Sequence, residues 1–267
     1  MREFLWALRF LTIIPLGRDT EDLPPQRAGV AMSLFPVVGL VIGLFLVVVY
    51  LPLAMLFPAK LADALIIMVF IIVTGALHLD GLADSLDGLL GGWDPRRRLE
   101  IMKDSRIGTF GVLGLFMVIG LKYLAFNDIG GHAPAAFPSL EAYLPPYGSF
   151  QEKATILLLM PVMGRWSQVL AAGLYPYARE EPGTASALVT NTHLRHAIFA
   201  SATAIFLAGL LIGDINFAII LTGVLAVSVI LQASYISSRI GGLTGDTLGA
   251  INEVTELLFL LSFYVII

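Results

Sequence analysis

The fold is decided by the stretch at residues 78–106, HLDGLADSLDGLLGGWDPRRRLEIMKDSR. It holds six of the chain's 20 acidic residues and five of its 16 basic ones, and strongly apolar segments lie on both sides of it. Ionisable side chains are costly inside a membrane, so such a cluster is expected at the water boundary. The stretch therefore predicts a polytopic membrane protein with polar chemistry at one interface.

The composition of the whole chain supports the same class. Of the 267 residues, 57% are hydrophobic and 13% are charged, and the mean hydropathy is +0.86. A soluble domain is roughly 25% charged. Apolar runs near the ~20 residues that cross a bilayer occur at 30–50, 61–78, 107–126, 154–175, 195–213, 215–236 and 253–267. We expect an all-α bundle of about seven transmembrane helices.

The N-terminal segment and the lack of long polar stretches define the domain organisation. Residues 1–16, MREFLWALRFLTIIPL, contain two arginines but no small-residue cleavage site, so they predict a retained, interfacial amphipathic helix. No polar stretch approaches the ~50 residues of a small soluble domain. We therefore expect residues 1–267 to form one transmembrane domain. The absence of cysteine excludes disulfides and thiolate chemistry.

Basic residues predict the orientation in the membrane. They cluster before the first apolar run and after the second, at Arg2, Arg9, Arg18, Arg27, Arg96, Arg97, Arg98, Lys103 and Arg106. By the positive-inside rule both segments are cytoplasmic. The same alternation places 127–153 outside and leaves 78–106, 176–194 and 237–256 on the cytoplasmic face of the cell membrane. These three segments are the expected catalytic regions.

Three carboxylates share one face of the helix expected from residue 78 to residue 90. With ~100° per residue, Asp80, Asp84 and Asp87 lie within one narrow sector, and His78 lies roughly opposite. Like charges spaced in this way destabilise a helix, so a positive partner is required. Either Mg²⁺, which is held by one or two carboxylates plus water and phosphate, or the nearby arginines would provide it.

The remainder of the stretch predicts a turn and a short helix. Gly91 and Gly92 end the first helix, Asp94 followed by proline predicts an N-cap, and the next helix runs from Pro95 to Asp104. The three consecutive arginines are either topology anchors or pyrophosphate ligands. Lys103, Asp104 and Arg106 are stronger functional candidates, because they precede the sequence IGTFG, whose glycines allow close backbone approach.

A second polar segment, GGLTGDTLGAINEVTE at 241–256, leads into the last apolar run. Asp246, Gly249 and Glu253 share a helical face, with Asn252 beside it. Asp246 is either a ligand or an N-cap. Glu253 is either functional or stabilised by the helix N-terminus.

Isolated polar residues add further candidates. Arg165 lies within the fourth apolar run and requires a partner, either a carboxylate or a phosphate. Gln168, three residues later, is expected on the same face of the helix. His78 is either a substrate ligand or a hydrogen-bonded interfacial residue. Lys122 is expected to extend toward the outer interface. Arg179 lies at the inner boundary, where basic anchors are common.

Several motifs together resemble the cobalamin synthases, which are adenosylcobinamide-GDP ribazoletransferases. The resemblance extends from FLTIIPLG and FPVVGLVIG through HLDGLADSLDGL and RRRLEIMKDSRIGTFG to GGLTGDTLGAINEVTE. The most specific part of the resemblance is that HLDGLAD and MKDSRIGTFG occur together within residues 78–111. The motifs cover nearly the whole chain.

The resemblance implies a Mg²⁺-dependent transfer at the cytoplasmic face. The adenosylcobinamide phosphoryl group would pass from adenosylcobinamide-GDP to α-ribazole or its 5′-phosphate, and GMP would be released. Asp80 and Asp84 are then expected to bind the metal, and Asp87 to bind metal or act as general base. The other expected site residues are Asp104 for catalysis and His78, Lys103, Arg106, Arg165, Arg179, Asp246, Asn252 and Glu253 for substrate binding.

Two rival classes fit less well. A CDP-alcohol phosphatidyltransferase requires DG-x-x-A-R, whereas residues 80–84 are DGLAD. A cation-coupled transporter would place its acidic residues near the midplane on repeated, interrupted helices, and no strong internal repeat is present. We expect small-molecule substrates and a lipid bilayer as partners, and no nucleic acid. The glycine content favours tight helix packing and leaves both a monomer and a homo-oligomer open.

Overall fold

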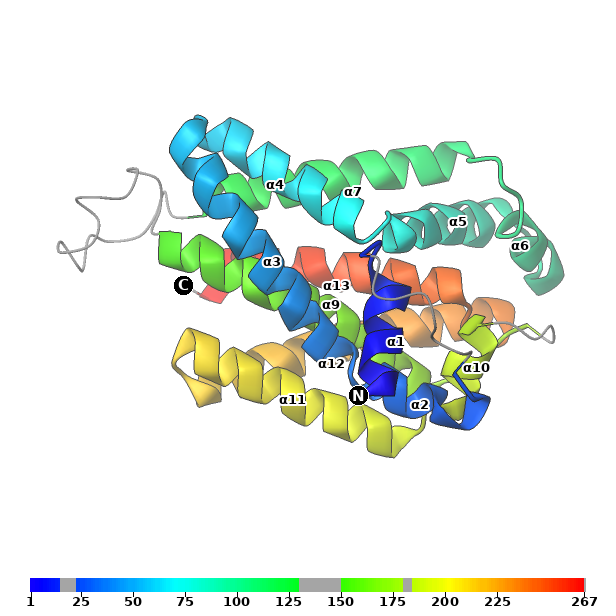
Figure 1. Cartoon of the computed structure of the whole chain (residues 1–267). Helices are drawn as coiled ribbons and strands as arrows, with labels where there is room; N and C mark the ends of the chain where they lie inside the picture. Colours follow the sequence, from blue (N-terminus) through cyan, green and yellow to red (C-terminus); the bar gives the residue numbers. More distant parts are fainter. Residues whose placement is uncertain (15–22, 130–149, 180–183, 267) are drawn as a thin grey trace.

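The computed structural model describes residues 1–14, 23–129, 150–179 and 184–266, and these residues are largely helical (Figure 1). The helices are α1 (Arg2–Leu11), α2 (Pro25–Ser33), α3 (Phe35–Leu56), α4 (Ala59–Val73), α5 (Leu77–Gly91), α6 (Pro95–Ile101), α7 (Thr109–Asp128), α9 (Phe150–Leu174), α10 (Thr184–Asn191), α11 (Leu194–Ile212), α12 (Ile215–Ile240) and α13 (Gly245–Ile266). The expected all-α membrane bundle is confirmed.

The expected count of seven spans is not confirmed. Within the described ranges, five helices are long and apolar enough to cross a membrane, namely α3, α7, α9, α11 and α12. The consecutive helices α4 and α5 make a sixth span if they are counted as one broken span. The run at 253–267 belongs to α13, a 22-residue helix that carries Asp246, Glu253 and Glu256 and is not among these candidates.

A sharp bend separates α4 from α5. The two helix axes differ by 85°, and the connecting residues Gly75 and Ala76 have φ values of 60° and 55°. Positive φ is uncommon for a residue other than glycine, so Ala76 marks a locally constrained backbone. The Thr74 hydroxyl donates to the Phe70 carbonyl at 2.9 Å at the end of α4. This bend directs the acidic helix α5 toward the end of the bundle that carries α6 (Figure 1).

Two helices, α9 and α13, occupy the centre of the bundle. In α9, 83% of the most apolar window is buried, compared with 28–33% in the other four candidate spans. Glycines allow α3 to approach α9 closely: a Cβ atom at Gly39 would lie 2.5 Å from the Pro161 carbonyl, and one at Gly43 would lie 2.6 Å from Leu158 Cα. Such small-residue contacts are the usual means of close helix packing in membranes.

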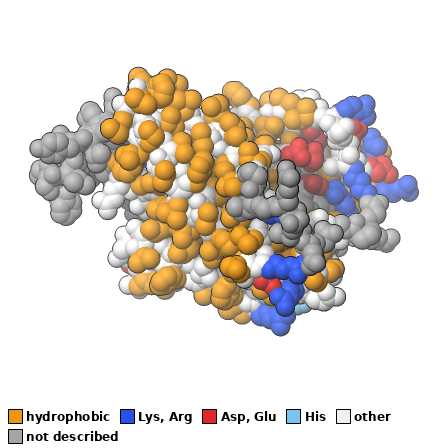
Figure 2. All heavy atoms as spheres, in the orientation of Figure 1, with side chains coloured by type: hydrophobic (Ala, Val, Ile, Leu, Met, Phe, Trp, Pro, Cys, Tyr) orange, Lys and Arg blue, Asp and Glu red, His pale blue; other side chains and the backbone are white. Residues whose placement is uncertain are grey.

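The surface divides into an apolar region and a charged end. Figure 2 shows hydrophobic side chains over most of the visible face, whereas basic and acidic side chains gather at the end where Figure 1 places α5, α6 and α10. Large apolar side chains such as Phe116 and Val48 are 77% and 71% exposed. Because that much apolar surface is unfavourable in water, this region is the lipid-facing surface of a multi-pass membrane protein.

The N-terminal segment contains the expected helix. In α1, Ala7, Leu8 and Leu11 are buried against the rest of the bundle. The backbone N–H of Ile13 donates to the Val73 carbonyl at 2.9 Å, which fixes the end of α1 near the bend after α4. The prediction for residues 1–16 is thus confirmed as helix over α1, and residues 15 and 16 lie outside the described residues. Most of the segment 127–153, expected outside, also lies outside them.

Candidate functional site

Residues 78–90 lie in one helix, α5, as predicted. Along it Asp80 is exposed, Asp84 is half-buried and Asp87 is buried. Among the described residues, neither Asp80 nor Asp84 has a hydrogen-bond or ion-pair partner for its carboxylate. Asp84 interacts electrostatically with Asp80, Asp246 and Asp87, which repel it, and with Arg179, which attracts it. We call these two carboxylates the acidic ridge.

Asp87 differs from the acidic ridge because both of its oxygens are occupied. It accepts hydrogen bonds from the backbone N–H groups of Gly108 at 2.6 Å and Gly111 at 2.9 Å. A Cβ atom at either glycine would lie 2.5 Å from an Asp87 oxygen, so only glycine permits this approach. The close backbone approach predicted for IGTFG is therefore directed at Asp87, which satisfies free N–H groups at the start of α7.

The turn after α5 follows the sequence prediction. Asp94 caps α6 by accepting from the Arg97 N–H at 2.9 Å, although the helix ends at Ile101 and not at residue 104. Arg98 is 6% exposed. It donates a hydrogen bond at 3.0 Å to the carbonyl of Arg239, which lies in the last turn of α12. Arg98 therefore joins α6 to α12, a structural contact that the sequence did not indicate.

Other charges of this segment form surface pairs. Arg96 pairs with Glu100 at 3.1 Å, and Arg106 pairs with Asp104 at 2.7 Å. The side chain of Arg106 is 88% exposed and Lys103 is also exposed, so both can reach a ligand in solution. Hydrogen bonds from Arg106 lower the pKa of Asp104 to about 2, which keeps this carboxylate ionised.

At the start of α13, Asp246 is an ion-pair partner and not an N-cap. Its carboxylate accepts from Arg179 at 2.7 Å. The cap is formed instead by Thr244, whose hydroxyl accepts from the Thr247 N–H at 3.2 Å. The Asp246–Arg179 pair connects two of the segments that were predicted to lie on the same face.

Close packing of α5 on α13 brings the acidic residues to one end of the bundle. A Cβ atom at Gly81 would lie 2.6 Å from the Asp246 carbonyl, and one at Gly249 would lie 3.1 Å from the His78 carbonyl. The Asp84 carboxylate consequently interacts electrostatically with Asp246 as well as with its own helix. Gly249, which was expected to share a helical face with Asp246 and Glu253, is thus a packing position against the backbone of His78.

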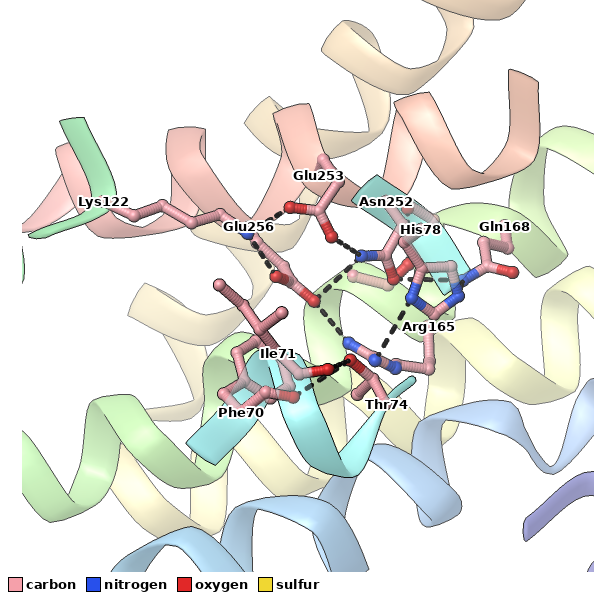
Figure 3. Close-up of polar contacts among 12 residues, drawn as sticks. Phe70, Ile71, Thr74, His78, Lys122, Arg165, Gln168, Asn252, Glu253 and Glu256 are labelled. Atoms are coloured by element: carbon pink, nitrogen blue, oxygen red, sulfur yellow. Dashed lines mark hydrogen bonds and ion pairs between the residues drawn. The ribbon is translucent and has the colours of Figure 1, made fainter. Parts of the chain in front are cut away.

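A second group of charges lies buried inside the bundle (Figure 3). Lys122 is 6% exposed and donates to Glu253 at 2.7 Å and to Glu256 at 2.6 Å. Glu256 also pairs with Arg165. The expectation that Lys122 extends toward the outer interface is wrong, because two carboxylates of α13 hold it inside. Of the partners left open for Arg165, the structure shows a carboxylate.

Amide and imidazole groups extend these ion pairs. Asn252 donates to Glu256 Oε1 at 2.9 Å and accepts from Gln168 at 3.0 Å. The Gln168 amide nitrogen also lies 2.9 Å from His78 Nε2, and His78 Nδ1 lies 3.3 Å from Arg165 Nη2. We call these residues the buried network: His78, Lys122, Arg165, Gln168, Asn252, Glu253 and Glu256.

A cavity connects the acidic ridge with the buried network. It has a volume of about 220 Å³ and is lined by residues that include Asp80, Asp246, His78 and Gln168. Asp80 is exposed, whereas His78 and Gln168 are 4% and 3% exposed. The cavity therefore extends inward from the charged end of the molecule to the edge of the buried network.

The predicted site residues thus fall into three places. Asp80 and Asp246 line the cavity together with His78, while Glu253, Asn252 and Arg165 lie in the buried network behind it. A third place is the exposed loop after α6, which holds Lys103, Asp104 and Arg106. Within the described ranges, no group of three or more His, Asp or Glu side chains is arranged to hold a metal ion by itself.

A separate buried charge pair was not recognised in the sequence. Lys153 donates to Asp63 at 2.6 Å, and Tyr50 and Asn127 complete the hydrogen bonding of the same carboxylate at 2.7 and 2.8 Å. Asp63 is fully buried. A single acid within the apolar run at 61–78 was the available indication, since such a residue requires a partner.

The bundle and its cavity define the class of protein: a multi-pass membrane protein with a polar site at one end. The family profile described as cobalamin-5-phosphate synthase matches residues 3–264. The chain therefore belongs to the cobalamin-5-phosphate synthase family, a group of transferases in cobalamin synthesis. No solved structure matches it.

Similar proteins extend over almost the full chain. An adenosylcobinamide-GDP ribazoletransferase of Syntrophobacter fumaroxidans is 37% identical over 95% of this chain and 94% of its own length. A protein of the same name from a Thermoanaerobacter species is 34% identical over 98% of this chain and 97% of its own. Another from Chlorobium phaeovibrioides is 37% identical over 94% and 92%.

Proposed function

We propose that this protein transfers the adenosylcobinamide phosphoryl group from adenosylcobinamide-GDP to α-ribazole or its 5′-phosphate and releases GMP. The observation that carries the proposal is the acidic ridge at the mouth of a cavity. The similar proteins are named adenosylcobinamide-GDP ribazoletransferase. Carboxylates without protein partners are suited to a cation, and the cation can in turn bind phosphate oxygens. The combination of an open charged mouth and a closed interior suits two substrates that differ in polarity.

The acidic ridge fits Mg²⁺. The ion typically takes one or two carboxylates, and completes its shell with water and substrate phosphates. Asp80 and Asp84 would supply these ligands, because neither carboxylate has a hydrogen-bond or ion-pair partner among the described residues. When bound, the ion neutralises the charge of the transferring phosphoryl group and of the leaving phosphate. We assign Asp87 to holding α7, since two backbone N–H groups already occupy its oxygens.

The chemistry is a substitution at phosphorus. A ribose hydroxyl of the acceptor forms a new P–O bond, the phosphoanhydride P–O bond breaks, and GMP leaves with the electron pair. The hydroxyl proton passes to a carboxylate oxygen. Asp80 lines the cavity, and its second oxygen would accept the proton while the first holds the metal. Alignment of the two substrates contributes the remainder of the catalysis.

Basic residues at the cavity mouth would bind the pyrophosphate. Arg179 lies beside the mouth through its pair with Asp246, and Lys103 and Arg106 are exposed on the loop after α6. Asp104 orients the Arg106 guanidinium. Arg165 is unsuited to this task, because it is buried against Glu256.

We place this end of the bundle in the cytoplasm. Arg96, Arg97 and Arg98 on α6, together with Arg239 at the end of α12, put an excess of positive charge there. Cytoplasmic segments of membrane proteins carry such an excess. The nucleotide substrates would then reach the site from the cytoplasm.

The direct test uses purified protein in proteoliposomes with labelled adenosylcobinamide-GDP, α-ribazole and Mg²⁺. We expect GMP release that requires both the acceptor and the metal. Wild-type protein that releases no GMP under these conditions contradicts the proposed function. Mg²⁺ dependence that is unchanged in Asp84→Asn contradicts the metal assignment alone.

A further inference from the structure

The cavity is too small for either complete substrate. Its volume of about 220 Å³ is below the ~300–1,000 Å³ of pockets that enclose drug-sized ligands. A corrin ring system or a whole nucleotide therefore remains outside it. Its volume suits one part of a substrate, such as a single planar ring system.

Most of the cavity wall is apolar. Phe10 of α1 and Phe35 of α3 lie on one side with their ring centroids 6.1 Å apart, in a stacked arrangement. Leu188 and Leu248 are buried and line the cavity as well. Aromatic and aliphatic walls with few polar groups favour a flat, weakly polar ligand, since each buried polar atom of a ligand needs a partner.

His78 and Gln168 form the polar inner end of the cavity, and the side-chain amide of Gln168 has a fixed orientation. Asn252 donates its amide N–H to Glu256, so its carbonyl oxygen faces Gln168 and the Gln168 amide nitrogen must point toward Asn252. Figure 3 shows the Gln168 carbonyl oxygen turned away from both Asn252 and His78. Gln168 therefore offers an acceptor oxygen, and the charges of the buried network determine its direction.

From these features we infer that the cavity holds the base of the acceptor nucleoside, with Phe10 against the ring and the buried Phe35 stacked on Phe10. This inference rests on the proposed function. The benzimidazole of α-ribazole is planar and carries no N–H group, which suits the apolar wall. The ribose hydroxyls are donors and match the carboxylate of Asp80, the exposed residue of the cavity lining.

The first test removes one aromatic wall. In Phe10→Leu we expect the KM for α-ribazole to rise about tenfold, because ring contacts beyond simple burial are lost, while the KM for adenosylcobinamide-GDP stays unchanged. Phe4→Leu is the matched control, because Phe4 lies on the same helix and is not part of the cavity wall. A KM that rises instead for adenosylcobinamide-GDP would assign the cavity to the donor substrate and overturn the inference.

The second test fills the cavity. Ala185→Leu adds volume at a lining position of α10. We expect the ratio of kcat/KM values to shift about tenfold toward an α-nucleoside with a smaller imidazole base. An unchanged ratio contradicts the inference. Binding of α-ribazole alone to wild-type and Phe10→Leu protein in nanodiscs, measured by calorimetry, tests the cavity independently of GMP release, and equal affinities would also contradict it.

Discussion

The acidic ridge on α5 and the buried network, which joins α5, α7, α9 and α13, are both made of polar and charged side chains, yet they have opposite relations to their surroundings. In the buried network, Lys122 and Arg165 are both matched by carboxylates of α13, and the amides between them are hydrogen-bonded. In the acidic ridge, Asp80 and Asp84 lack a partner among the described residues. Paired charges hold helices together, whereas unpaired carboxylates at the surface are free for ligands. The two groups should therefore respond differently to mutation.

The largest effect is expected in the buried network. Glu256→Gln removes the carboxylate shared by Lys122 and Arg165. Leaving a buried charge without its partner costs about 3–5 kcal/mol, so the free energy of unfolding should fall by that amount. Chemical denaturation in detergent micelles measures it. A loss below about 1 kcal/mol would show that the network does not stabilise the bundle.

A double variant sharpens this test. Lys122→Met alone leaves Glu253 and Glu256 with only Arg165 as a cation, whereas Lys122→Met with Glu253→Gln restores equal numbers of charges. The double variant should be more stable than the single one, because it leaves fewer unpaired buried charges. If the two variants are equally stable, the Lys122–Glu253 contact does not matter for folding.

The acidic ridge should show the reverse pattern. Asp80→Asn is expected to reduce the transfer rate about 100-fold or more, in the range of lost electrostatic stabilisation, with no loss of stability because it relieves like-charge repulsion. GMP release and denaturation curves measure the two quantities. Asp94→Asn is the control, since asparagine caps α6 equally well. A destabilised Asp80→Asn protein would contradict the distinction between the two regions.

Asp87 is on the same helix as the acidic ridge but is buried and hydrogen-bonded, and its glycine contacts can be tested by a matched pair on α7. Gly111→Ala places a Cβ atom 2.5 Å from an Asp87 oxygen, whereas a Cβ atom at Gly120 meets nothing within 4 Å. We expect Gly111→Ala to lower stability by about 1–3 kcal/mol, and Gly120→Ala to raise it by about 0.5–1 kcal/mol. Similar values for both would exclude a structural role for the Asp87 contact.

The smallest effect is expected on the exposed loop. Arg106→Gln should raise the KM for adenosylcobinamide-GDP up to about tenfold at low salt, and less at high salt because exposed charges are screened. Stability should not change measurably, as for most exposed ion pairs. Arg96→Gln, which breaks a comparable surface pair with Glu100, is the control. An equal KM change in both variants would indicate a general charge effect.

Local patterns in the sequence predicted much of this arrangement. The step of the α-helix placed Asp80 and Asp84 together, and Asp94 with Pro95 marked the start of α6. Contacts between distant segments were not predictable in the same way. Lys122 and Glu253 are 131 residues apart, and no spacing rule connects them. The sequence indicated that Arg165 needs a partner, but only packing of α9 on α13 identifies Glu256.

Partners so far apart impose an order on biosynthesis. The ribosome completes Lys122 and Arg165 long before Glu253 and Glu256, which lie in the last helix. Until that helix emerges, both cations lack the carboxylates that they contact in the finished bundle. The charge pairing of α7 and α9 is therefore completed by α13, after both helices have been synthesised. Truncation before Glu253 would remove both carboxylates at once and leave Lys122 and Arg165 without the partners that they contact in the bundle.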